Sequence, residues 1–159
     1  MLVRDQAEAP APAGVPVRFF ATGMSLVIHP RSPRVPTVHL NVRYFELTGP
    51  EGGVIDAWFG GGTDLTPCHP APEDAKHFHR TLADLCARHH PGFYPRYKRW
   101  CDDYVFIRHR KEPRRVGGIF FDDLSEGGFD RCFALTRSVG DHFLPAYAPI
   151  LERRRDLPY

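Results

Sequence analysis

Four histidines are the residues best suited to carry chemistry. His29, His39, His79 and His109 lie on predicted strands or on the inward side or near the end of predicted helices. Four imidazoles that converge would suit a divalent transition metal, because imidazole nitrogen is a common ligand of such ions. Their wide and uneven spacing is not that of a compact metal motif, and single histidines are often satisfied by local hydrogen bonds. The residues alone leave both interpretations open.

A predicted strand from Thr37 to Leu47 carries one of these histidines on a polar face. Its alternation places His39, Asn41 and Arg43 on one side and apolar side chains on the other. Such a polar face usually turns to water. It would also form a wall for an anionic ligand, because Arg binds carboxylates or phosphates through paired N–H groups. A shorter predicted strand over 25–29 could lie beside it with the polar faces aligned.

The segment WFGGGTDLTP at 58–67 is more specific. It follows a predicted strand over 54–59, and its three glycines let the backbone approach another group closely or adopt positive φ. Asp64, just beyond them, could accept hydrogen bonds from N–H groups of a ligand. The other interpretation is a flexible loop tip. Neither a P-loop nor a GxGxxG motif is present, and no serine has the context of a hydrolase nucleophile.

The elements that must position these residues predict an α+β fold with a mainly antiparallel sheet. The further elements are a strand over 116–121 and helices over about 72–90, from Pro95 to near His109, over 129–143 and from Pro145. On the first helix His79 falls within the apolar arc, whereas His77 lies among charged residues. The adjacent carboxylates Asp122 and Asp123 point apart on a strand, so they are expected to cap or to pair with cations.

Composition limits the class of protein. The chain has 159 residues, 42% of them hydrophobic, which predicts one folded domain over 17–159 after a flexible tail at 1–16. The net charge of +2 is too small to indicate nucleic acid. No apolar stretch is long enough to span a membrane, and the tail lacks the apolar core of a signal peptide, so we expect a cytoplasmic protein. The four cysteines lack zinc or redox spacing and are expected to be reduced, small hydrophobic residues.

Six segments together carry a resemblance to a known family. They are SLVIHPRSPRVPTVHLNVRYFE at 25–46, WFGGGTDLTP at 58–67, EDAKHFHRTL at 73–82, FYPRYKRWCDDY at 93–104, HRKEPRRVGGIFFDDL at 109–124 and FLPAYAPILERRRDLPY at 143–159. In this order they resemble the oxygen-dependent coproporphyrinogen-III oxidases. The resemblance implies a large, flat, mainly antiparallel sheet flanked by helices on both faces, and a homodimer. The implied reaction belongs to haem biosynthesis: coproporphyrinogen III loses CO2 from two propionates, with O2 as co-substrate and without flavin or haem, giving protoporphyrinogen IX.

The resemblance also implies roles for particular residues. The implied ligands of a divalent metal cation are His29, His39, His79 and His109. The implied substrate contacts are Ser25, Asn41, Val42 and Arg43. The implied catalytic residues are Arg43, His39 as proton donor and Asp64, which would hold the pyrrole N–H groups. These types suit the chemistry, because Arg pairs with propionates and a carboxylate accepts from N–H donors.

Two departures from the family pattern qualify this resemblance. The usual chain begins upstream of Phe19 and continues past Tyr159, so we expect a chain truncated at both ends that exposes a sheet edge and apolar surface. Thr63 stands where the family more usually has an apolar residue. The alternative hypothesis is a catalytically inactive fragment that at most binds a tetrapyrrole or a divalent metal.

Overall fold

The structure is a computed structural model that describes residues 16–106, 109, 111 and 116–159. The predicted tail at 1–16 therefore lies almost wholly outside the described residues. None of the described helices is long and apolar enough to cross a membrane.

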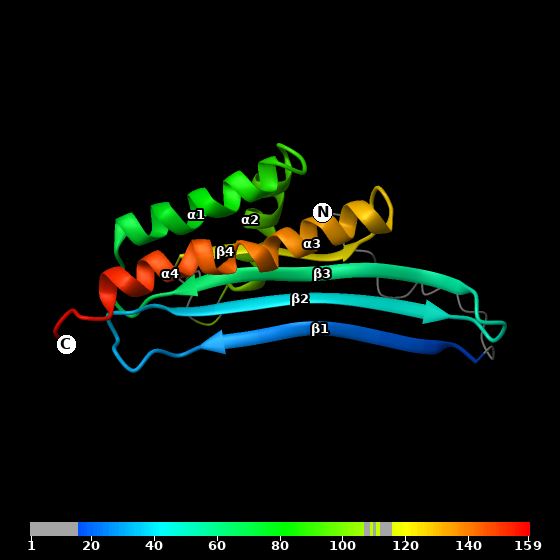
Figure 1. The fold of residues 1–159 in the computed structure, drawn as a ribbon, viewed down its shortest axis with the longest axis horizontal. Coiled ribbons are helices and arrows are strands. Elements are labelled where there is room, and N and C mark those ends of the chain that lie inside the picture. Colours follow the sequence, from blue (N-terminus) through cyan, green and yellow to red (C-terminus); the bar gives the residue numbers. More distant parts are fainter. Residues whose placement is uncertain (1–15, 107–108, 110, 112–115) are drawn as a thin grey trace.

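Within the described residues, four strands form one antiparallel sheet in the order in which they follow along the chain (Figure 1). They are β1 (Arg18–Ile28), β2 (Thr37–Thr48), β3 (Val54–Thr66) and β4 (Gly117–Leu124). β1 and β2 pair with Ser25 opposite Asn41, and β2 and β3 pair with His39 opposite Asp64. The predicted α+β class with an antiparallel sheet is confirmed, as is the prediction that the first two strands lie side by side.

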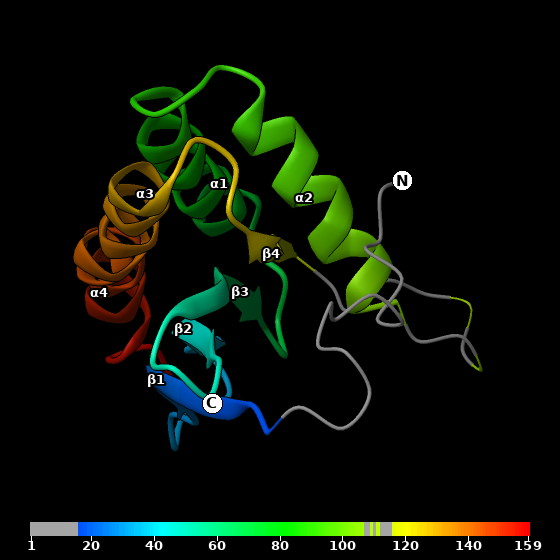
Figure 2. The ribbon, with the colours of Figure 1, turned by 90° about the vertical axis from the view of Figure 1, so that its right-hand side faces the viewer.

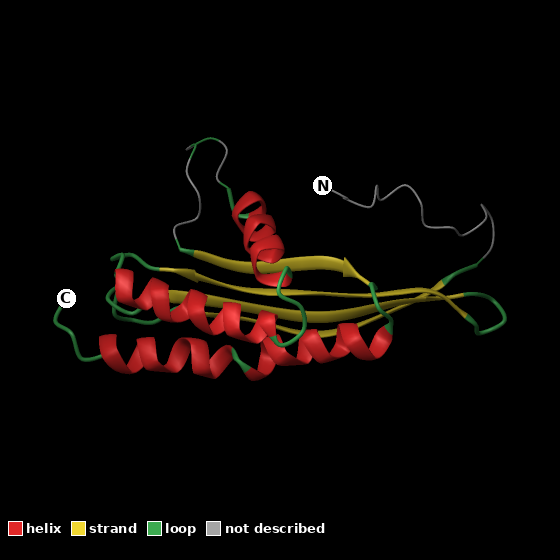
Figure 3. Ribbon diagram, turned by 90° about the horizontal axis from the view of Figure 1, so that it is seen from above, coloured by secondary structure: helices red, strands yellow, loops and turns green. Residues whose placement is uncertain are grey.

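In the part of the chain that the structure describes, four helices accompany the sheet: α1 (Pro72–Ala87), α2 (Phe93–Tyr104), α3 (Phe129–Asp141) and α4 (Phe143–Arg154). α1, α3 and α4 form a layer on one face, whereas α2 lies at the β4 edge (Figures 2 and 3). From this edge α2 reaches both faces. Its Tyr97 contacts Phe121 on the side of the helix layer, and its Tyr104 stacks on Phe120 on the opposite side.

The core lies between the sheet and the layer of α1, α3 and α4. The alternation in β2 buries Val38 and Leu40 completely, and they pack with side chains from all three helices, such as Phe78, Leu135 and Ile150. Each such side chain contributes about 1.5–3 kcal/mol by leaving water. This face therefore fixes the sheet, and the other face of β2 is left for polar residues.

Several helix boundaries differ from the sequence prediction, and α2 begins at Phe93 instead of Pro95. α2 ends at Tyr104 and does not reach His109, because Val105 leaves the helix with φ −90° and ψ 6°. His109 lies in an exposed turn beyond it. α4 begins at Phe143 instead of Pro145, because a proline is tolerated in the first turn, where the backbone N–H has no partner within the helix.

The three glycines at 60–62 lie inside β3, so their interpretation as a flexible loop tip is wrong. A Cβ on Gly61 would lie 2.9 Å from the carbonyl oxygen of Asn41 on β2. A Cβ on Gly62 would lie 2.4 Å from the carbonyl oxygen of Ile119 on β4. The glycines therefore permit a close approach, as the other interpretation predicted, and at these two positions the neighbouring backbone makes it.

Three of the four cysteines, Cys86, Cys101 and Cys132, are buried as predicted, whereas Cys68 is exposed. Burial raises the pKa of the Cys86 and Cys101 thiols to about 12. These two side chains are therefore neutral at physiological pH and serve as packing groups.

Candidate active site on the open face of the sheet

The polar residues of β2 share one face of the sheet, opposite α1, α3 and α4. Directly opposed residues of neighbouring strands lie on the same side of a sheet. The register therefore brings residues of three strands onto the face that we call the open face: Gly23 and Ser25 of β1, His39, Asn41, Arg43 and Phe45 of β2, and Trp58, Gly60, Gly62 and Asp64 of β3. Val42 points its side chain toward the helix layer, so a ligand on the open face could meet only its backbone.

His39 and Asp64 form a close pair at one end of the open face. Nδ1 of His39 lies 2.9 Å from Oδ2 of Asp64, and the imidazole is 34% exposed whereas the carboxylate is 10% exposed. A carboxylate can only accept, so Nδ1 carries the hydrogen and Nε2 keeps a lone pair in the neutral ring. The hydroxyl of Thr63 donates to the backbone carbonyl of His39 at 2.7 Å, which fixes this residue further.

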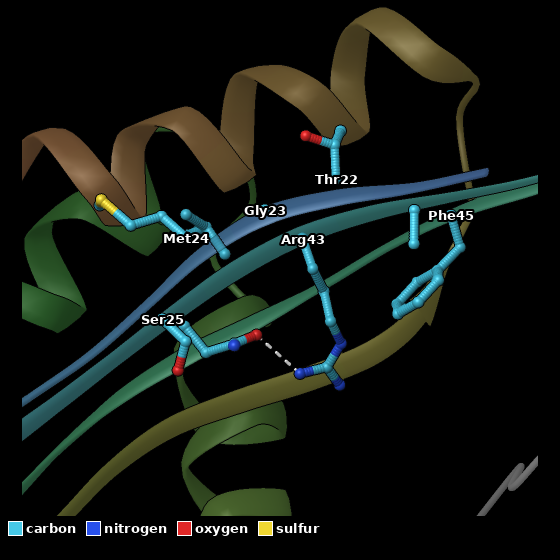
Figure 4. A pocket seen from close by; sticks show the side chains of 9 residues that line it. Thr22, Gly23, Met24, Ser25, Arg43 and Phe45 are labelled. Atoms are coloured by element: carbon cyan, nitrogen blue, oxygen red, sulfur yellow. Dashed lines mark hydrogen bonds between the residues drawn. The ribbon is translucent and has the colours of Figure 1, made fainter.

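Arg43 lies four residues further along β2, about 14 Å from His39 at the rise of an antiparallel strand. Its Nη1 donates to Oδ1 of Asn41 at 2.7 Å (Figure 4), and its Nη2 donates to Oδ2 of Asp122 on β4 at 2.7 Å. The guanidinium also lies 5.9 Å from the ring centroids of Phe45 and Phe120. Arg43 is thus held in place while further N–H groups remain for a ligand.

A shallow hollow borders Arg43 on the side of β1. Gly23 stands directly opposite Arg43 and lacks a side chain, so the hollow opens between Ser25, Asn41, Arg43 and Phe45 (Figure 4). Polar groups line one end of it and an aromatic ring the other. This mixture suits a ligand that joins a carboxylate to an apolar ring.

An aromatic row continues the open face beyond Arg43. Phe19, Phe45 and Trp58 come from three neighbouring strands, and their ring centroids are 5.6 and 5.5 Å apart in succession. With Arg43 and Asp122 they line a second hollow. This row offers apolar surface for a cyclic ligand beside the cation.

The helix-borne histidines make separate contacts. His79 uses both ring nitrogens: Nε2 donates to the carbonyl of Val116 at 2.8 Å, and Nδ1 accepts from the hydroxyl of Tyr94 at 3.0 Å. Burial lowers the pKa of His79. His77 bonds the carbonyl of Pro145 on α4 at 3.0 Å. His79 is therefore the more enclosed of the two, as the helical pattern predicted.

The four predicted metal ligands do not come together in the part of the chain that the structure describes. His29 and His109 are exposed, His39 pairs with Asp64, and both nitrogens of His79 are engaged within the protein. Among the described residues, no three His, Cys, Asp or Glu side chains form a group that could hold a metal ion. The present arrangement does not fit a metal held by these residues, and the metal assignment stays a prediction.

A comparison with models of protein families identifies the chain. Residues 3–159 match the model described as coproporphyrinogen III oxidase. The chain belongs to the coproporphyrinogen III oxidase family. This family consists of oxidoreductases of porphyrin and haem biosynthesis. The family resemblance that the ordered motifs indicate is thus supported by a match over nearly the whole chain.

Two features of this candidate site were not predicted from the sequence. Phe45 and Trp58 continue the alternation that places Arg43 and Gly60 on the open face, so counting two residues on from Arg43 and two residues back from Gly60 would have found them. Asp122 was expected to cap or to pair with a cation, and it does pair with one. Its partner Arg43 lies 79 residues away, and no local pattern reports such a contact.

Proposed function

We propose that the open face binds coproporphyrinogen III and carries its oxidative decarboxylation, with O2 as the oxidant, to protoporphyrinogen IX. The observation that carries the proposal is the arrangement on one sheet face of a fixed cation, Arg43, about 14 Å along β2 from the His39–Asp64 pair. This separation suits a ligand of several rings rather than a single pyrrole. The substrate offers what these groups recognise, namely propionates and pyrrole N–H donors.

Arg43 binds a propionate of the substrate in this proposal. Its N–H groups that Asn41 and Asp122 do not use donate to the carboxylate, and charge-assisted bonds of this kind are among the stronger ones in proteins. The hydroxyl of Ser25 and the amide of Asn41 lie in the same hollow and supply further polar contacts. The aromatic row accommodates the apolar rim of the macrocycle.

The His39–Asp64 pair provides the charge and the proton exchange. Asp64 accepts from pyrrole N–H groups and stabilises positive charge that develops on the electron-rich ring. Each propionate that becomes a vinyl group loses CO2, one proton and two electrons. Two such conversions supply four electrons and two protons, and with two further protons from solvent they reduce one O2 to two molecules of water. His39 exchanges protons through Nε2, the nitrogen that its bond to Asp64 leaves with the lone pair.

Substitution of the two charged residues tests this assignment. Arg43→Ala and Asp64→Ala should each lower kcat/KM for coproporphyrinogen III at least about a hundredfold, because each removes charge-assisted contacts to the substrate. Arg137→Ala is the matched control, since Arg137 forms an exposed ion pair with Asp141 within α3. Near-normal activity of both site variants would exclude the open face as the active site.

The same turnover assay distinguishes the proposed enzyme from the alternative, a catalytically inactive fragment that only binds a tetrapyrrole. A chain that binds the oxidised porphyrin coproporphyrin III but forms no vinyl product in air would be the inactive tetrapyrrole-binding protein. Product formation above the no-protein control refutes that alternative. The comparison needs only the purified chain, air and chromatography of the tripropionate and dipropionate products.

A divalent metal and a homodimer are further proposals, and they rest on the family resemblance. No step above uses a metal, because the described histidines do not converge. Stoichiometric metal binding that is lost with His79→Ala and kept with His77→Ala would support the metal assignment. For the dimer, the exposed apolar side chains of the edge strand β1, such as Phe20 and Met24, provide surface that association could cover. Light scattering of the purified chain measures the assembly state.

A further inference from the structure

We propose that Asp122 is a positioning residue, which holds the guanidinium of Arg43 in the orientation that meets a substrate carboxylate. The inference rests on the proposed function for the identity of the carboxylate ligand. Its structural part, that Asp122 orders Arg43, stands on the contacts of these two side chains alone.

The first argument is the way in which the guanidinium is held from two sides. Asn41, on the same strand, accepts from Nη1, and Asp122, on β4, accepts from Nη2, each at 2.7 Å. The rings of Phe45 and Phe120 flank the group at 5.9 Å. Two acceptors at the two ends of a planar group fix its plane, and without Asp122 the only hydrogen bond left among the described residues is the one to Asn41 on its own strand.

The second argument is the glycine beneath the pair. A Cβ on Gly60 would lie 2.5 Å from Oδ1 of Asp122 and 2.6 Å from Nε of Arg43. The side chains of Arg43 on β2 and Asp122 on β4 therefore both pack directly over Gly60 on β3, in the space that a larger residue would fill. Oδ1 of Asp122 is buried and has no hydrogen-bond partner within the described part of the protein. A buried acceptor in this state requires an explanation, and holding Arg43 through the other oxygen supplies one.

A purely structural role accounts for the pair less well. The side chains of Arg43 and Asp122 are 24% and 33% exposed, and ion pairs with that access to water contribute little to stability. Ordering a long side chain before the ligand arrives has a larger effect on binding. We therefore expect loss of Asp122 to raise the KM for coproporphyrinogen III, and the Kd for coproporphyrin III, about tenfold with a smaller change in kcat.

The test compares Asp122→Asn in the wild-type and Arg43→Ala backgrounds. The Kd of coproporphyrin III, measured by fluorescence, should rise about tenfold in the wild-type background and stay unchanged where Arg43 is absent. Glu126→Gln is the control, because it removes a carboxylate from an exposed ion pair with Arg96 just after β4. Equal weakening in both backgrounds overturns the proposal. Tighter binding by Asp122→Asn does so too, because it would mean that Asp122 only neutralises the cation.

A second readout needs no ligand. The Nε–H NMR signal of Arg43, assigned through Arg43→Lys, should report an ordered guanidinium in the wild type and a mobile one in Asp122→Asn. An unchanged signal overturns the proposal, provided that circular dichroism shows both proteins folded. A further outcome is that the wild type fails to bind coproporphyrin III while the Arg43 signal still becomes mobile in Asp122→Asn. That combination supports the positioning role of Asp122 and refutes the proposed function, so the two failures are distinguishable.

Discussion

Gly60→Ala is the substitution that most directly perturbs the Arg43–Asp122 arrangement without removing either charge. The new methyl group would lie 2.5 Å from Oδ1 of Asp122 and 2.6 Å from Nε of Arg43, well inside van der Waals contact. Both of these atoms belong to side chains, so the side chains move and the strands keep their pairing. Overpacking of this kind costs about 1–3 kcal/mol of stability. The displaced cation should lower kcat/KM about 10- to 100-fold, from the loss of one or two charge-assisted bonds to the substrate.

The assay is steady-state turnover of coproporphyrinogen III, with urea unfolding of the same preparations to show that the variant is folded. Gly140→Ala is the control, because a Cβ there meets no atom within 4 Å and Gly140 lies in α3. It should raise the unfolding free energy by about 0.5–1 kcal/mol with unchanged turnover. A folded Gly60→Ala enzyme with wild-type kcat/KM would refute the reasoning that places Arg43 at the substrate.

Three further predictions concern stability. Burial lowers the pKa of His89, so the unfolded chain binds the proton more readily than the folded one. The protein therefore loses stability as the pH falls below about 6.5. His89→Gln should reduce this loss, measured by urea unfolding between about pH 7 and pH 5. The carboxylate of Asp74 accepts hydrogen bonds from both Arg153 and Arg154. Asp74→Ala should lower the unfolding free energy by about 2 kcal/mol, which is less than for a fully buried ion pair because Arg153 is partly exposed. An unchanged unfolding free energy would contradict the structural role of Asp74. His79→Ala removes two hydrogen bonds and should lower the unfolding free energy by about 1–3 kcal/mol, and an unchanged midpoint would show that these contacts are not formed.

The face on which the candidate residues lie could be predicted from the sequence, because strand alternation is a local property. His39, Asn41 and Arg43 needed only the period of two to be placed together, and Asp64 joined them through the family motif. The helical period likewise identified His79 as more enclosed than His77. The class of fold followed from the order of these elements.

The contacts between distant segments could not be predicted in this way. From the sequence alone, the glycines at 60–62 could equally well form a loop tip. What requires glycine at 61 and 62 is the backbone of the two neighbouring strands, which the sequence around these residues does not reveal. The role of Asp122 depends on Arg43 being opposite it across Gly60, a relation between three strands. The end of α2 before His109 was missed for a similar reason, since an apolar pattern continues past the residue at which the backbone leaves the helix.

The most direct test of the account is the reaction of the purified chain with coproporphyrinogen III under reducing conditions, in air and under argon. Chromatography should show the tripropionate intermediate and then the dipropionate product in air, with little product under argon and little from Arg43→Ala. The same product yield with and without O2, or equal yields from the wild type and Arg43→Ala, would contradict the proposed oxygen-dependent reaction on the open face.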